Sequence, residues 1–521
     1  MGELLQASPG RWRDTPTSGL SYQWRRCGPT GAKCRSIRTA TQSSYRLTRS
    51  DLGRTLRVVV TAASGSHRTR AVSTRTAVVQ SDRDFANVWI SPTGGSCQRS
   101  ATAARFAPAR ACATPAAAYA VANATADATK ILVKGGTYPP FLIDGARSSP
   151  NRIIFEAAPG ERPVFAGGYL QIGVGEVTWR GPDYVTVRNL ETAEFGPGFA
   201  NPSNRYGIYV APGSSHIRLE NMRAGNFLIQ AAQDIAVIGG DFGPCRAADG
   251  GQPCEINKVD HYPGAPQPSR ILIDGATFHD YDLGPSCFGV GDGGTSSGTP
   301  DCHWRAMYLN GVHNFTLRNS VFRDSFIAPW FTISGPEASA SGNKNILIEN
   351  NIFGTGVNYG NPGRYNGRQY ARWESIDLAW CQNVSNGVFA YDNVTYRFNS
   401  GSRSAGLAVL FSESGCQGKI RNVRAYGNIG LRNRCDPLVE YRYNVYSNSG
   451  RCHSTDVALG RGSFPFYVKD TDAPHPGDFR LRGRRAAPDN RVPARLGCPR
   501  TDRTGKPRPR KGFCDAGAFE R

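Results

Sequence analysis

The feature that most constrains the fold is a short template that recurs from about residue 130 onward. Each copy places two apolar residues two positions apart, follows them with Asn, Gly or Asp in most cases, and often ends on an aromatic residue. The clear copies are Ile131-Val133-Gly135-Tyr138, Val185-Val187-Asn189, Ile217-Leu219-Asn221, Ile235-Val237-Gly239-Phe242, Ile271-Ile273-Gly275-Phe278, Phe315-Leu317-Asn319-Phe322 and Ile346-Ile348-Asn350-Phe353. Weaker copies are Ile153-Phe155-Ala157 and Val388-Ala390-Asp392.

This template predicts an all-β fold built as a parallel β-helix. Apolar residues with a period of two indicate strands whose alternate side chains point inward. Asn or Gly after the last apolar residue predicts a special backbone conformation at the strand end, and inward Asn side chains can form a ladder. Copies at irregular intervals indicate a solenoid with loops inserted between its strands. About nine coils, stacked roughly 4.8 Å apart, would make a rod of about 40–45 Å.

A second strand-like run precedes many copies of the template. These runs are 207–210, 306–309, 330–333, 375–378 and 408–411. We expect their alternate apolar residues to point inward, namely Met307 and Leu309, Phe331 and Ile333, Ile376 and Leu378, and Val409 and Phe411. The outward face would then carry Tyr308, Trp330, Thr332, Ser375 and Asp377. Such a face is where solenoids usually bind ligands.

The first 80 residues follow a different pattern. Short alternating runs, such as Leu56-Val58-Val60, are separated by turns, which is typical of a β-sandwich with Trp24 in its core. The segment Tyr22-Gln23-Trp24-Arg25-Arg26-Cys27, with Cys34, Tyr45-Arg46-Leu47 and Asp51-Leu52-Gly53 after it, resembles bacterial immunoglobulin-like modules of secreted actinobacterial proteins. The resemblance implies a spacer or adhesive module over residues 1–80, followed by a linker at 81–86.

Two further segments carry a second resemblance. They are the opening run Val88-Trp89-Ile90-Ser91-Pro92-Thr93-Gly94-Gly95, which leads to Thr137-Tyr138-Pro139, and the closing run Asp515-Ala516-Gly517-Ala518-Phe519-Glu520. Together they resemble secreted right-handed parallel β-helix proteins of the pectate-lyase-like superfamily. The resemblance implies a right-handed β-helix over 87–495, an alanine-rich helix within 116–128 that caps the first coil, and a disulfide-closed tail over 496–521 that packs on the β-helix.

The 14 cysteines fall into seven sequence-local pairs. The even count and the lack of C-x-x-C spacing indicate disulfides rather than a metal site, and therefore an oxidising compartment. The pairs are Cys27 with Cys34, Cys97 with Cys112, Cys245 with Cys254, Cys287 with Cys302, Cys381 with Cys416, Cys435 with Cys452 and Cys498 with Cys514. No run reaches the ~18 apolar residues of a membrane span, and residues 1–10 lack a signal-peptide core. We therefore expect an extracellular or cell-surface protein whose export signal is removed or not included.

The formal net charge is +21, and arginine supplies most of the positive charge. A basic surface attracts polyanions, and arginine pairs with carboxylate or sulfate groups through a two-pronged contact. No long basic run or basic helix concentrates this charge. Two interpretations therefore remain open, an acidic polysaccharide partner or charge spread evenly for solubility. No motif indicates a specific nucleic acid partner.

The stretch 279–310 holds the most polar candidates for catalysis. A disulfide between Cys287 and Cys302 would bring its two ends together. In β-helix lyases a basic residue abstracts a proton beside a uronate carboxylate that a metal ion or arginine neutralises, and in β-helix hydrolases carboxylates serve as general acid and base. The resemblance implies such roles for His279, Asp280, His303 and Arg305. Related sequences often carry an acidic residue where this chain has Arg305, and the alternative is that His279, Asp280 and His303 only order a long loop.

A second group of candidates lies on the later strand runs. Asp377 is a candidate second catalytic acid or metal ligand. The expected substrate-binding residues are Tyr308, Trp330, Trp373, Glu374 and Glu413, since sugar rings pack their C–H faces on aromatic side chains. The alternative is a polar rim in which the tryptophans pack under a loop.

Three functions follow from these patterns. The first is an extracellular carbohydrate-active enzyme, a polysaccharide lyase or glycoside hydrolase that acts on an acidic polysaccharide. The alternative is a non-catalytic cell-surface adhesin or structural rod that binds polyanionic glycans, and binding of polyanions by charge alone is a third. No cofactor is certain, although Ca²⁺ is an option for neutralising a uronate carboxylate. No pattern of a trimer interface is present.

Overall fold

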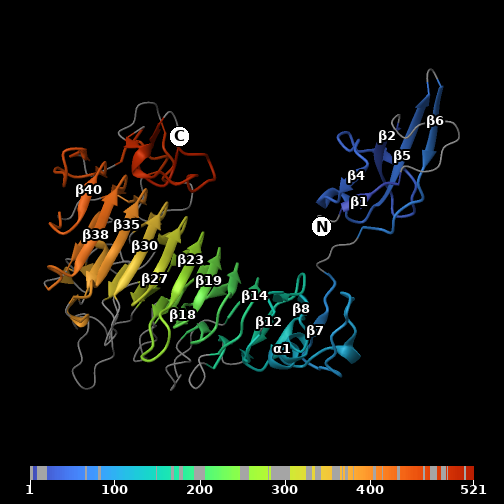
Figure 1. Cartoon of the computed structure of the whole chain (residues 1–521), viewed down its shortest axis with the longest axis horizontal. Coiled ribbons are helices and arrows are strands. Elements are labelled where there is room, and N and C mark those ends of the chain that lie inside the picture. Colours follow the sequence, from blue (N-terminus) through green and yellow to red (C-terminus); the bar gives the residue numbers. More distant parts are fainter. Residues whose placement is uncertain are drawn as a thin grey trace. The chain divides into compact units, whose positions relative to one another are not determined.

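The chain divides into two compact units in the computed structural model (Figure 1). The first comprises Met1–Ala86 with Thr102–Phe106, and the second comprises Asn87–Ala101 with Ala107–Arg521. The described residues are 4–8, 20–64, 67–79, 84–147, 149–165, 169–174, 180–192, 206–246, 257–279, 281–282, 306–323, 331–334, 342–354, 364–365, 368–369, 374–379, 381–385, 387–402, 406–412, 415–430, 435–460, 464–469, 478–482, 488–489, 491–509 and 512–520.

The first unit is a small antiparallel β structure. A four-stranded sheet has the order β3-β2-β5-β6, and a separate pair joins β1 to β4. The strands are β1 (Leu4–Gln6), β2 (Leu20–Cys27), β3 (Arg35–Ser36), β4 (Ser44–Arg46), β5 (Thr55–Ser64) and β6 (His67–Val72), with a 3-10 helix η2 at Arg49–Asp51. Trp24 is buried with Val58 and Val60, as the alternation predicts, and its indole N–H donates to the Gln42 carbonyl at 2.9 Å.

The second unit is dominated by a long parallel sheet, here called sheet 1. It contains twelve strands within the described residues, which follow one another in chain order. They are β7 (Val88–Ile90), β8 (Thr129–Val133), β11 (Ile153–Ala157), β14 (Val185–Arg188), β16 (Arg218–Glu220), β19 (Gln233–Ile238), β23 (Ser269–Asp274), β27 (His313–Arg318), β30 (Asn343–Glu349), β35 (Tyr391–Arg397), β38 (Ile420–Tyr426) and β40 (Glu440–Arg442).

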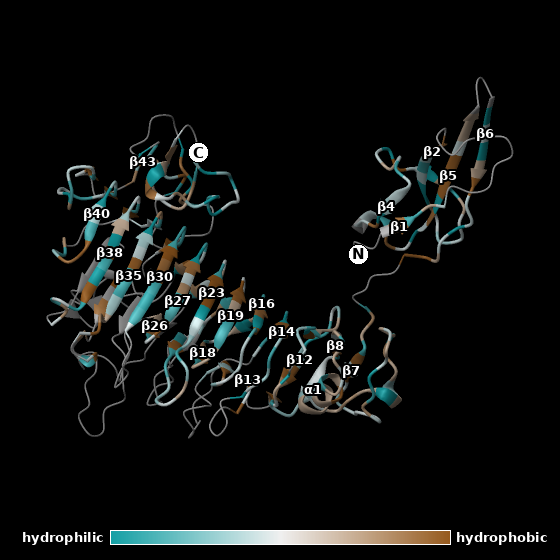
Figure 2. Cartoon of the chain, in the orientation of Figure 1, coloured by the Kyte–Doolittle hydropathy of each residue, from teal (hydrophilic) through white to brown (hydrophobic). Residues whose placement is uncertain are grey.

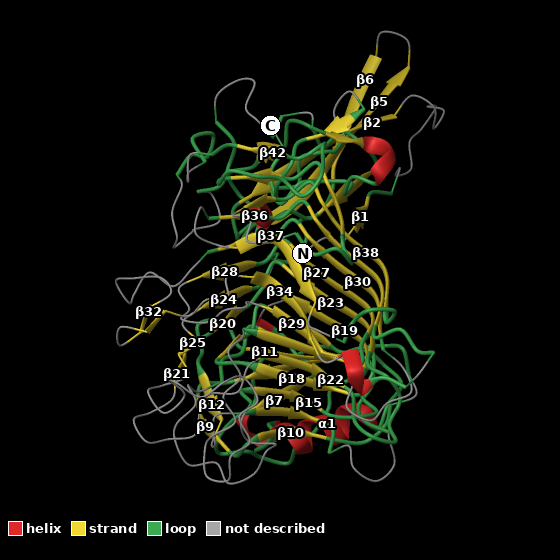
Figure 3. Cartoon of the chain, turned by 90° about the vertical axis from the view of Figure 1, so that its left-hand side faces the viewer, coloured by secondary structure: helices red, strands yellow, loops and turns green. Residues whose placement is uncertain are grey.

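Two further parallel sheets run beside sheet 1 (Figures 1 and 3). Sheet 2 comprises β10 (Phe141–Ile143), β13 (Leu170–Ile172), β15 (Ile208–Val210), β18 (Phe227–Gln230), β22 (Asn257–Asp260), β26 (Met307–Asn310), β29 (Phe331–Ser334), β34 (Glu374–Ala379) and β37 (Gly406–Ser412). Sheet 3 comprises β17 (Arg223–Ala224), β20 (Asp241–Phe242), β24 (Thr277–His279), β28 (Val321–Arg323), β31 (Ile352–Phe353), β36 (Ser400–Gly401), β39 (Ile429–Gly430), β41 (Val445–Tyr446) and β42 (Val457–Ala458).

The remaining elements are short. They are α1 (Pro115–Asn123), the pairs β9 (Gly136–Tyr138) with β12 (Pro163–Phe165), β21 (Cys245–Arg246) with β25 (Tyr281–Asp282), β32 (Arg364–Tyr365) with β33 (Arg368–Gln369) and β43 (Val492–Pro493) with β44 (Phe513–Cys514), and the 3-10 helices η4 (Pro108–Arg110), η8 (Cys381–Asn383) and η9 (Ala494–Leu496).

The register shows that each copy of the template is one coil of the solenoid. Ile235 pairs with Ile271, Ile271 with Phe315 and Phe315 with Ile346, all in parallel. Their side chains lie in the buried core inside the three sheets, and Figure 2 shows apolar residues along these strands. A chain that visits sheets 1, 3 and 2 in turn and returns one strand further along is a parallel β-helix. The fold class expected from the sequence is confirmed.

The predicted backbone conformation at the strand ends is also confirmed. Asn189, Asn221, Asn319 and Asn350 all have φ between 51 and 57°, in the left-handed region that Asn tolerates better than most residues. In the later coils, the inward ladder is formed by the residue that directly follows the one in the left-handed conformation. Its buried members are Asn351, Asn399, Asn428 and Asn444, each of which donates from Nδ2 to the following side chain.

One detail of the predicted repeat is wrong. Val394, rather than Val388, pairs with Ile346, so the coil at β35 is Val394-Tyr396, where a tyrosine replaces the second aliphatic residue. In β37 the register places Leu410 opposite Ile376 and Phe411 opposite Asp377, because the pairing with β34 shifts after Glu374. The side chains of β37 are outside what the structure describes, so the expected inward pair of Val409 and Phe411 stays a prediction.

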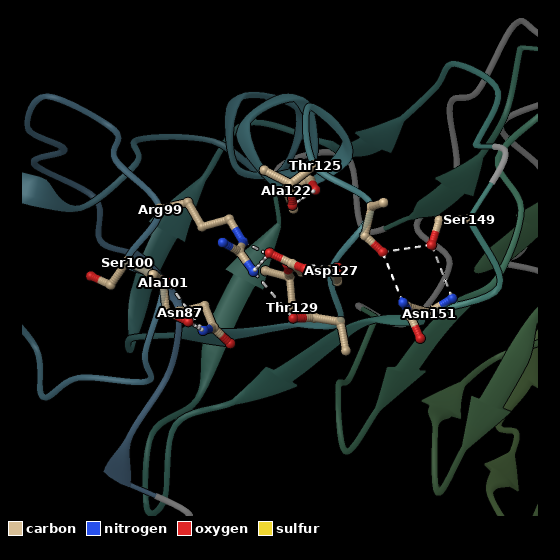
Figure 4. Close-up of polar contacts among 12 residues, drawn as sticks. Asn87, Arg99, Ser100, Ala101, Ala122, Thr125, Asp127, Thr129, Ser149 and Asn151 are labelled. Carbon is tan, nitrogen blue, oxygen red and sulfur yellow. Dashed lines mark hydrogen bonds and ion pairs between the residues drawn. The ribbon is translucent and has the colours of Figure 1, made fainter.

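Helix α1 packs on the first coils of the β-helix, within the alanine-rich segment predicted to cap it. Thr114 accepts a hydrogen bond from the Ala117 N–H and so caps the helix N-terminus. Beyond α1, Arg99 donates to Thr129 Oγ1 at 2.9 Å and to Asp127 at 3.3 Å, and Asn87 donates to the Ser100 carbonyl (Figure 4). These bonds hold the 97–101 segment against the start of sheet 1.

Five of the seven expected disulfides are present, namely Cys27–Cys34, Cys97–Cys112, Cys381–Cys416, Cys435–Cys452 and Cys498–Cys514. The structure does not test the other two expected bridges, Cys245–Cys254 and Cys287–Cys302. Cys254, Cys287 and Cys302 lie outside the described residues, and only the strand position of Cys245, in β21, is described. Both bridges therefore stay predictions.

The C-terminal segment packs on the last coils. It forms a second core with Phe398 and Ile429, and the Ala518 N–H donates to Ser400 Oγ. These contacts join the tail to β36 and β39 of sheet 3.

Candidate functional site

The outward face of sheet 2 brings together side chains from successive coils. In β26, Met307 and Leu309 are fully buried in the core, so Tyr308 and Asn310 project to the other side. In β22 the same alternation turns Lys258 and Asp260 outward, and the parallel register sets Lys258 beside Tyr308 and Asp260 beside Asn310. Two neighbouring coils therefore contribute one polar cluster.

Direct contacts join the four side chains of this cluster. Asn310 Nδ2 donates to Asp260 Oδ1 at 2.7 Å, and Lys258 Nζ lies 3.8 Å from Asp260 Oδ2. The Lys258 ammonium also lies over the Tyr308 ring, 5.4 Å from its centroid, which is a cation–π contact. The arrangement places a fixed cation next to a phenol, with a carboxylate holding the cation. We call Lys258, Asp260, Tyr308 and Asn310 the sheet 2 cluster.

The cluster is only partly open to solvent. The side chain of Lys258 is 22 % exposed and that of Asp260 14 %, whereas Tyr308 is 4 % exposed. The earlier coils of this face are also covered, because Tyr209 and Leu228 pack with Tyr206, and the Tyr209 hydroxyl donates to Gln230 Oε1 at 2.8 Å. Tyr308 is therefore not presented as an open stacking platform in this conformation.

The backbone of two predicted residues lies on the same sheet. Asp377 is opposite Thr332, which is opposite Tyr308, so Asp377 belongs to the row of positions that includes Lys258. Its neighbours Ile376 and Leu378 are buried. Glu374 begins the same strand. The side chains of Glu374 and Asp377 are outside what the structure describes.

His279 lies on sheet 3, not on sheet 2. Its Nε2 is 3.0 Å from Asp241 Oδ1 on the neighbouring coil, and this contact lowers the pKa of the Asp241 carboxyl. Gly243 leaves room there, since a Cβ at Gly243 would come within 1.9 Å of the His279 carbonyl oxygen. The structure therefore pairs His279 with Asp241, which the sequence did not suggest. Whether His279 takes part in catalysis stays a prediction.

Six predicted residues lie outside the described part of the chain. They are Asp280, His303, Arg305, Trp330, Trp373 and Glu413. The predicted gathering of His279, Asp280, His303 and Arg305 is therefore not tested. His303 and Arg305 immediately precede β26, the strand that carries Tyr308.

Sequence reasoning missed Lys258, Asp260 and Asn310. Asp260 is the last residue of strand β22. The signal was the alternation in Asn257-Lys258-Val259-Asp260, which matches Met307-Tyr308-Leu309-Asn310. Aligning these two runs would have set the two pairs side by side.

Two further findings concern ligands and membranes. Within the described residues, no group of three or more His, Cys, Asp or Glu side chains is arranged to hold a metal ion. No helix in the same part of the chain is long and apolar enough to cross a membrane.

Comparisons with known proteins add one distant likeness. A solved structure that matches is the crystal structure of alginate lyase from Paenibacillus sp. str. FPU-7, with 15 % sequence identity and a TM-score of 0.36, covering 63 % of this chain and 96 % of that chain. No family model matches this sequence, and no curated protein matches it.

Proposed function

We propose that this chain is an extracellular carbohydrate-active protein that binds an acidic polysaccharide along the outer face of sheet 2 and cleaves it as a lyase. The observation that carries the proposal is the Lys258–Tyr308 contact, held by Asp260. Nine strands spaced about 4.8 Å apart give this face a length of about 38 Å, which is enough for several sugar rings.

Elimination beside a uronate needs two groups that this cluster supplies. A cation must neutralise the sugar carboxylate so that the adjacent carbon can lose its proton, and a base must accept that proton. Lys258 is the cation, and Tyr308, acting as a phenolate beside that cation, accepts the proton from the sugar carbon. The phenol so formed gives this proton to the leaving oxygen of the glycosidic bond as the double bond forms. Asp260 and Asn310 are positioning residues that fix the lysine.

A hydrolase fits the cluster less well. Hydrolysis of a glycosidic bond uses two carboxyl groups that can act as acid and base. The Asp260 carboxylate is already held by Asn310 and Lys258, so it is poorly placed to transfer protons. The proposal routes no step through Ca²⁺, because the described residues contain no suitable group of ligands.

The predicted residues outside the described segments complete the proposal. His303 and Arg305 extend the proton-transfer and charge-neutralising set next to β26, and Asp377 lies in the same row of sheet 2. Trp330, Trp373, Glu374 and Glu413 are the proposed sugar contacts. Asp280 and His279 keep their predicted roles at the neighbouring corner.

One observation favours a second candidate function. Tyr308 and Tyr209 are 4 % and 7 % exposed, so the described part of this face is covered at these two coils. A covered face suits a non-catalytic cell-surface adhesin or structural rod that binds polyanionic glycans.

In either case we propose an immunoglobulin-like module over residues 1–80, a linker at 81–86, the β-helix over 87–495 and a closing tail over 496–521. The five disulfides support an oxidising location outside the cytoplasm.

A substrate screen tests the lyase proposal. The full chain is incubated with polyuronates, such as polygalacturonate and alginate, and with a neutral glucan. A lyase produces unsaturated products that absorb in the ultraviolet, in step with new reducing ends. New reducing ends without that absorbance would replace the lyase with a hydrolase, and binding without either product would favour the adhesin or rod.

A further inference from the structure

The positive charge of this chain is concentrated in its first unit. Residues 20–79 hold twelve Arg and Lys side chains but one acidic residue, Asp51, so these sixty residues supply 11 of the 21 net charges. Of the two interpretations of the charge left open by the sequence, an even spread along the chain is therefore wrong. No long basic run marks the excess, because no two of these residues, apart from Arg25 and Arg26, are adjacent in sequence.

The one carboxylate in this stretch is not available to the surface. Asp51 is fully buried, and Arg26 Nε donates to its Oδ1 at 2.7 Å. The other carboxylate oxygen accepts from the Thr48 N–H, the Thr48 hydroxyl and the Tyr45 hydroxyl. Asp51 thus compensates Arg26 and leaves the other cations of residues 20–79 with no acidic residue of that stretch to pair with.

Four of these cations share the outer face of the four-stranded sheet. Leu56, Val58 and Val60 of β5 are buried on the inner side, so Arg57, Thr61 and Ala63 project outward. The antiparallel register sets Arg25 opposite Arg57, Arg70 opposite Thr61 and Arg68 opposite Ala63, on that same side. We call Arg25, Arg57, Arg68 and Arg70 the arginine face.

The arginine face costs the fold stability when nothing is bound. Arg25 and Arg57 are like charges directly across a strand pair, which is an unfavourable pairing. Their Nε–H groups have no hydrogen-bond partner within the described structure. Arg75 adds a fifth cation, since a Cβ at Gly31 would lie 2.7 Å from Arg75 Cδ and 3.5 Å from Arg57 Nη2. An anionic ligand would relieve this repulsion.

We propose that the first unit is an anion-binding module whose arginine face holds an acidic polysaccharide. Eleven of the twelve cations are arginine, which bonds carboxylate and sulfate groups in bidentate geometry. The outward positions Ser21, Gln23, Val59 and Thr61 carry no aromatic ring, so the face lacks the stacking platforms that single-stranded nucleic acids use. The disulfide Cys27–Cys34 fits an extracellular polymer. The module binds whether or not sheet 2 is catalytic.

The test compares two triple variants of the full chain. Arg57→Gln/Arg68→Gln/Arg70→Gln removes three charges from the arginine face. The control, Arg35→Gln/Arg38→Gln/Arg54→Gln, removes three exposed charges of the same unit that lie off the arginine face. Arg35 is opposite Arg26 and therefore on the other side of the sheet, and Arg38 and Arg54 lie outside the strands. Binding to immobilised polygalacturonate, dextran and duplex DNA is measured at low and high salt, with thermal melting to confirm that each variant folds.

We expect the affinity of the face variant for polygalacturonate to fall by about fivefold or more, and that of the control variant to fall by less than about twofold. Neither variant should bind dextran. Added polygalacturonate should also protect peptides of β2 and β5 from hydrogen exchange in the unmodified chain. Equal losses in both variants, or no loss in either, would overturn the proposal. Tighter binding of duplex DNA at equal phosphate and carboxylate concentration would reassign the partner. Cleavage of soluble polygalacturonate reports on sheet 2 separately, so a failed lyase assay leaves this result unaffected.

Discussion

The backbone N–H of Asn444 donates to Asp456 Oδ1 at 2.9 Å, a bond that an asparagine side chain accepts in the preceding coils. Asp456 thus terminates the buried asparagine ladder. Its second oxygen accepts from the N–H groups of Cys452 and His453 at 3.2 and 2.9 Å. The ladder therefore ends on a group whose oxygens accept hydrogen bonds, directly before β42, the last strand of sheet 3.

The ladder predicts a large cost for removing one of its members. Asn428 Oδ1 accepts from the backbone and side chain of Asn399, and its Nδ2 donates to the Tyr396 carbonyl and to Asn444. Asn428→Ala leaves several buried polar groups without partners, and we expect the free energy of unfolding to fall by about 3 kcal/mol. Urea denaturation measures it. Asn422→Gly is the control, because Asn422 is exposed at φ 57° and glycine adopts that conformation easily. A loss for Asn428→Ala no larger than the control's would show that the ladder contributes little.

The stability of the fold should depend on the carboxylate at the end of the ladder, and replacing one of its oxygens by an amide nitrogen tests this. Asp456→Asn keeps the shape but offers an NH₂ group to the Cys452 and His453 N–H groups or to Asn444, so one donor faces another. We expect a destabilisation of about 2 kcal/mol, measured by the same denaturation. An unchanged midpoint would mean that the local backbone rearranges.

The sheet 2 cluster predicts two different kinetic effects, provided that the chain cleaves a polyuronate. Lys258→Met and Tyr308→Phe should each lower kcat/KM by about 100-fold or more, since each removes a group needed for proton abstraction. Lys344→Met replaces an exposed lysine of sheet 1 and should leave kcat/KM within about twofold. Asn310→Ala should fall between these, because it frees Asp260 and loosens the lysine. Full activity in Tyr308→Phe would remove the phenol from the mechanism.

The first unit should lose stability in acid. Burial raises the pKa of Asp51, but hydrogen bonds from Thr48, Arg26 and Tyr45 outweigh it, so the pKa in the folded unit lies below the ordinary aspartate value. The unfolded chain then binds the proton first, and the stabilisation is present above about pH 4 and lost as the pH falls through the folded-state pKa.

The corresponding variant is Asp51→Asn. At pH 7 it should lower the protection of β2 and β5 in hydrogen exchange by about 2 kcal/mol, and the difference from the unmodified chain should shrink towards pH 3. Asp84→Asn, which alters an exposed carboxylate of the same unit, should change little. A difference that persists at low pH would point to packing rather than charge.

An aromatic stack inside the coil predicts a further stability effect. The Phe322 ring stacks between Phe278 and Phe353, with centroids 4.6 and 4.9 Å apart. Phe322→Ala should cost about 3–5 kcal/mol through lost contacts and a cavity. Phe513→Ala, at a ring that is 42 % exposed, should cost much less. Thermal melting of the two variants separates these outcomes.

The sequence predicted sheet 1 well because each of its strands carries its own local pattern. Copies such as Ile271-Ile273-Gly275 contain the alternation and the strand-ending glycine within a few residues. The copy at β35 was placed wrongly because Tyr396 and Phe398 replace the usual aliphatic residue and Asn, with Phe398 at φ 53°. Local pattern alone could not reveal that the fold accepts these residues there.

The sheet 2 cluster could not be found in the same way, because its partners are far apart in the chain. Asn310 and Asp260 bond to each other across a separation of 50 residues. Each strand by itself offers only two outward polar positions, and their meaning depends on the register between coils. The arginine face was missed for the same reason, since Arg25 and Arg57 meet only through strand pairing.

The asparagine ladder also shows how such a scaffold tolerates change. Its members keep nearly the same hydrogen bond from coil to coil, yet the chain between consecutive members shrinks from 48 residues to 29, 16 and 12. The geometry of the stack does not depend on the length of the chain segment that connects two coils. Insertions and deletions can therefore accumulate in these connecting segments while the scaffold is inherited intact. This gives the architecture a route to new ligand specificities without a new fold.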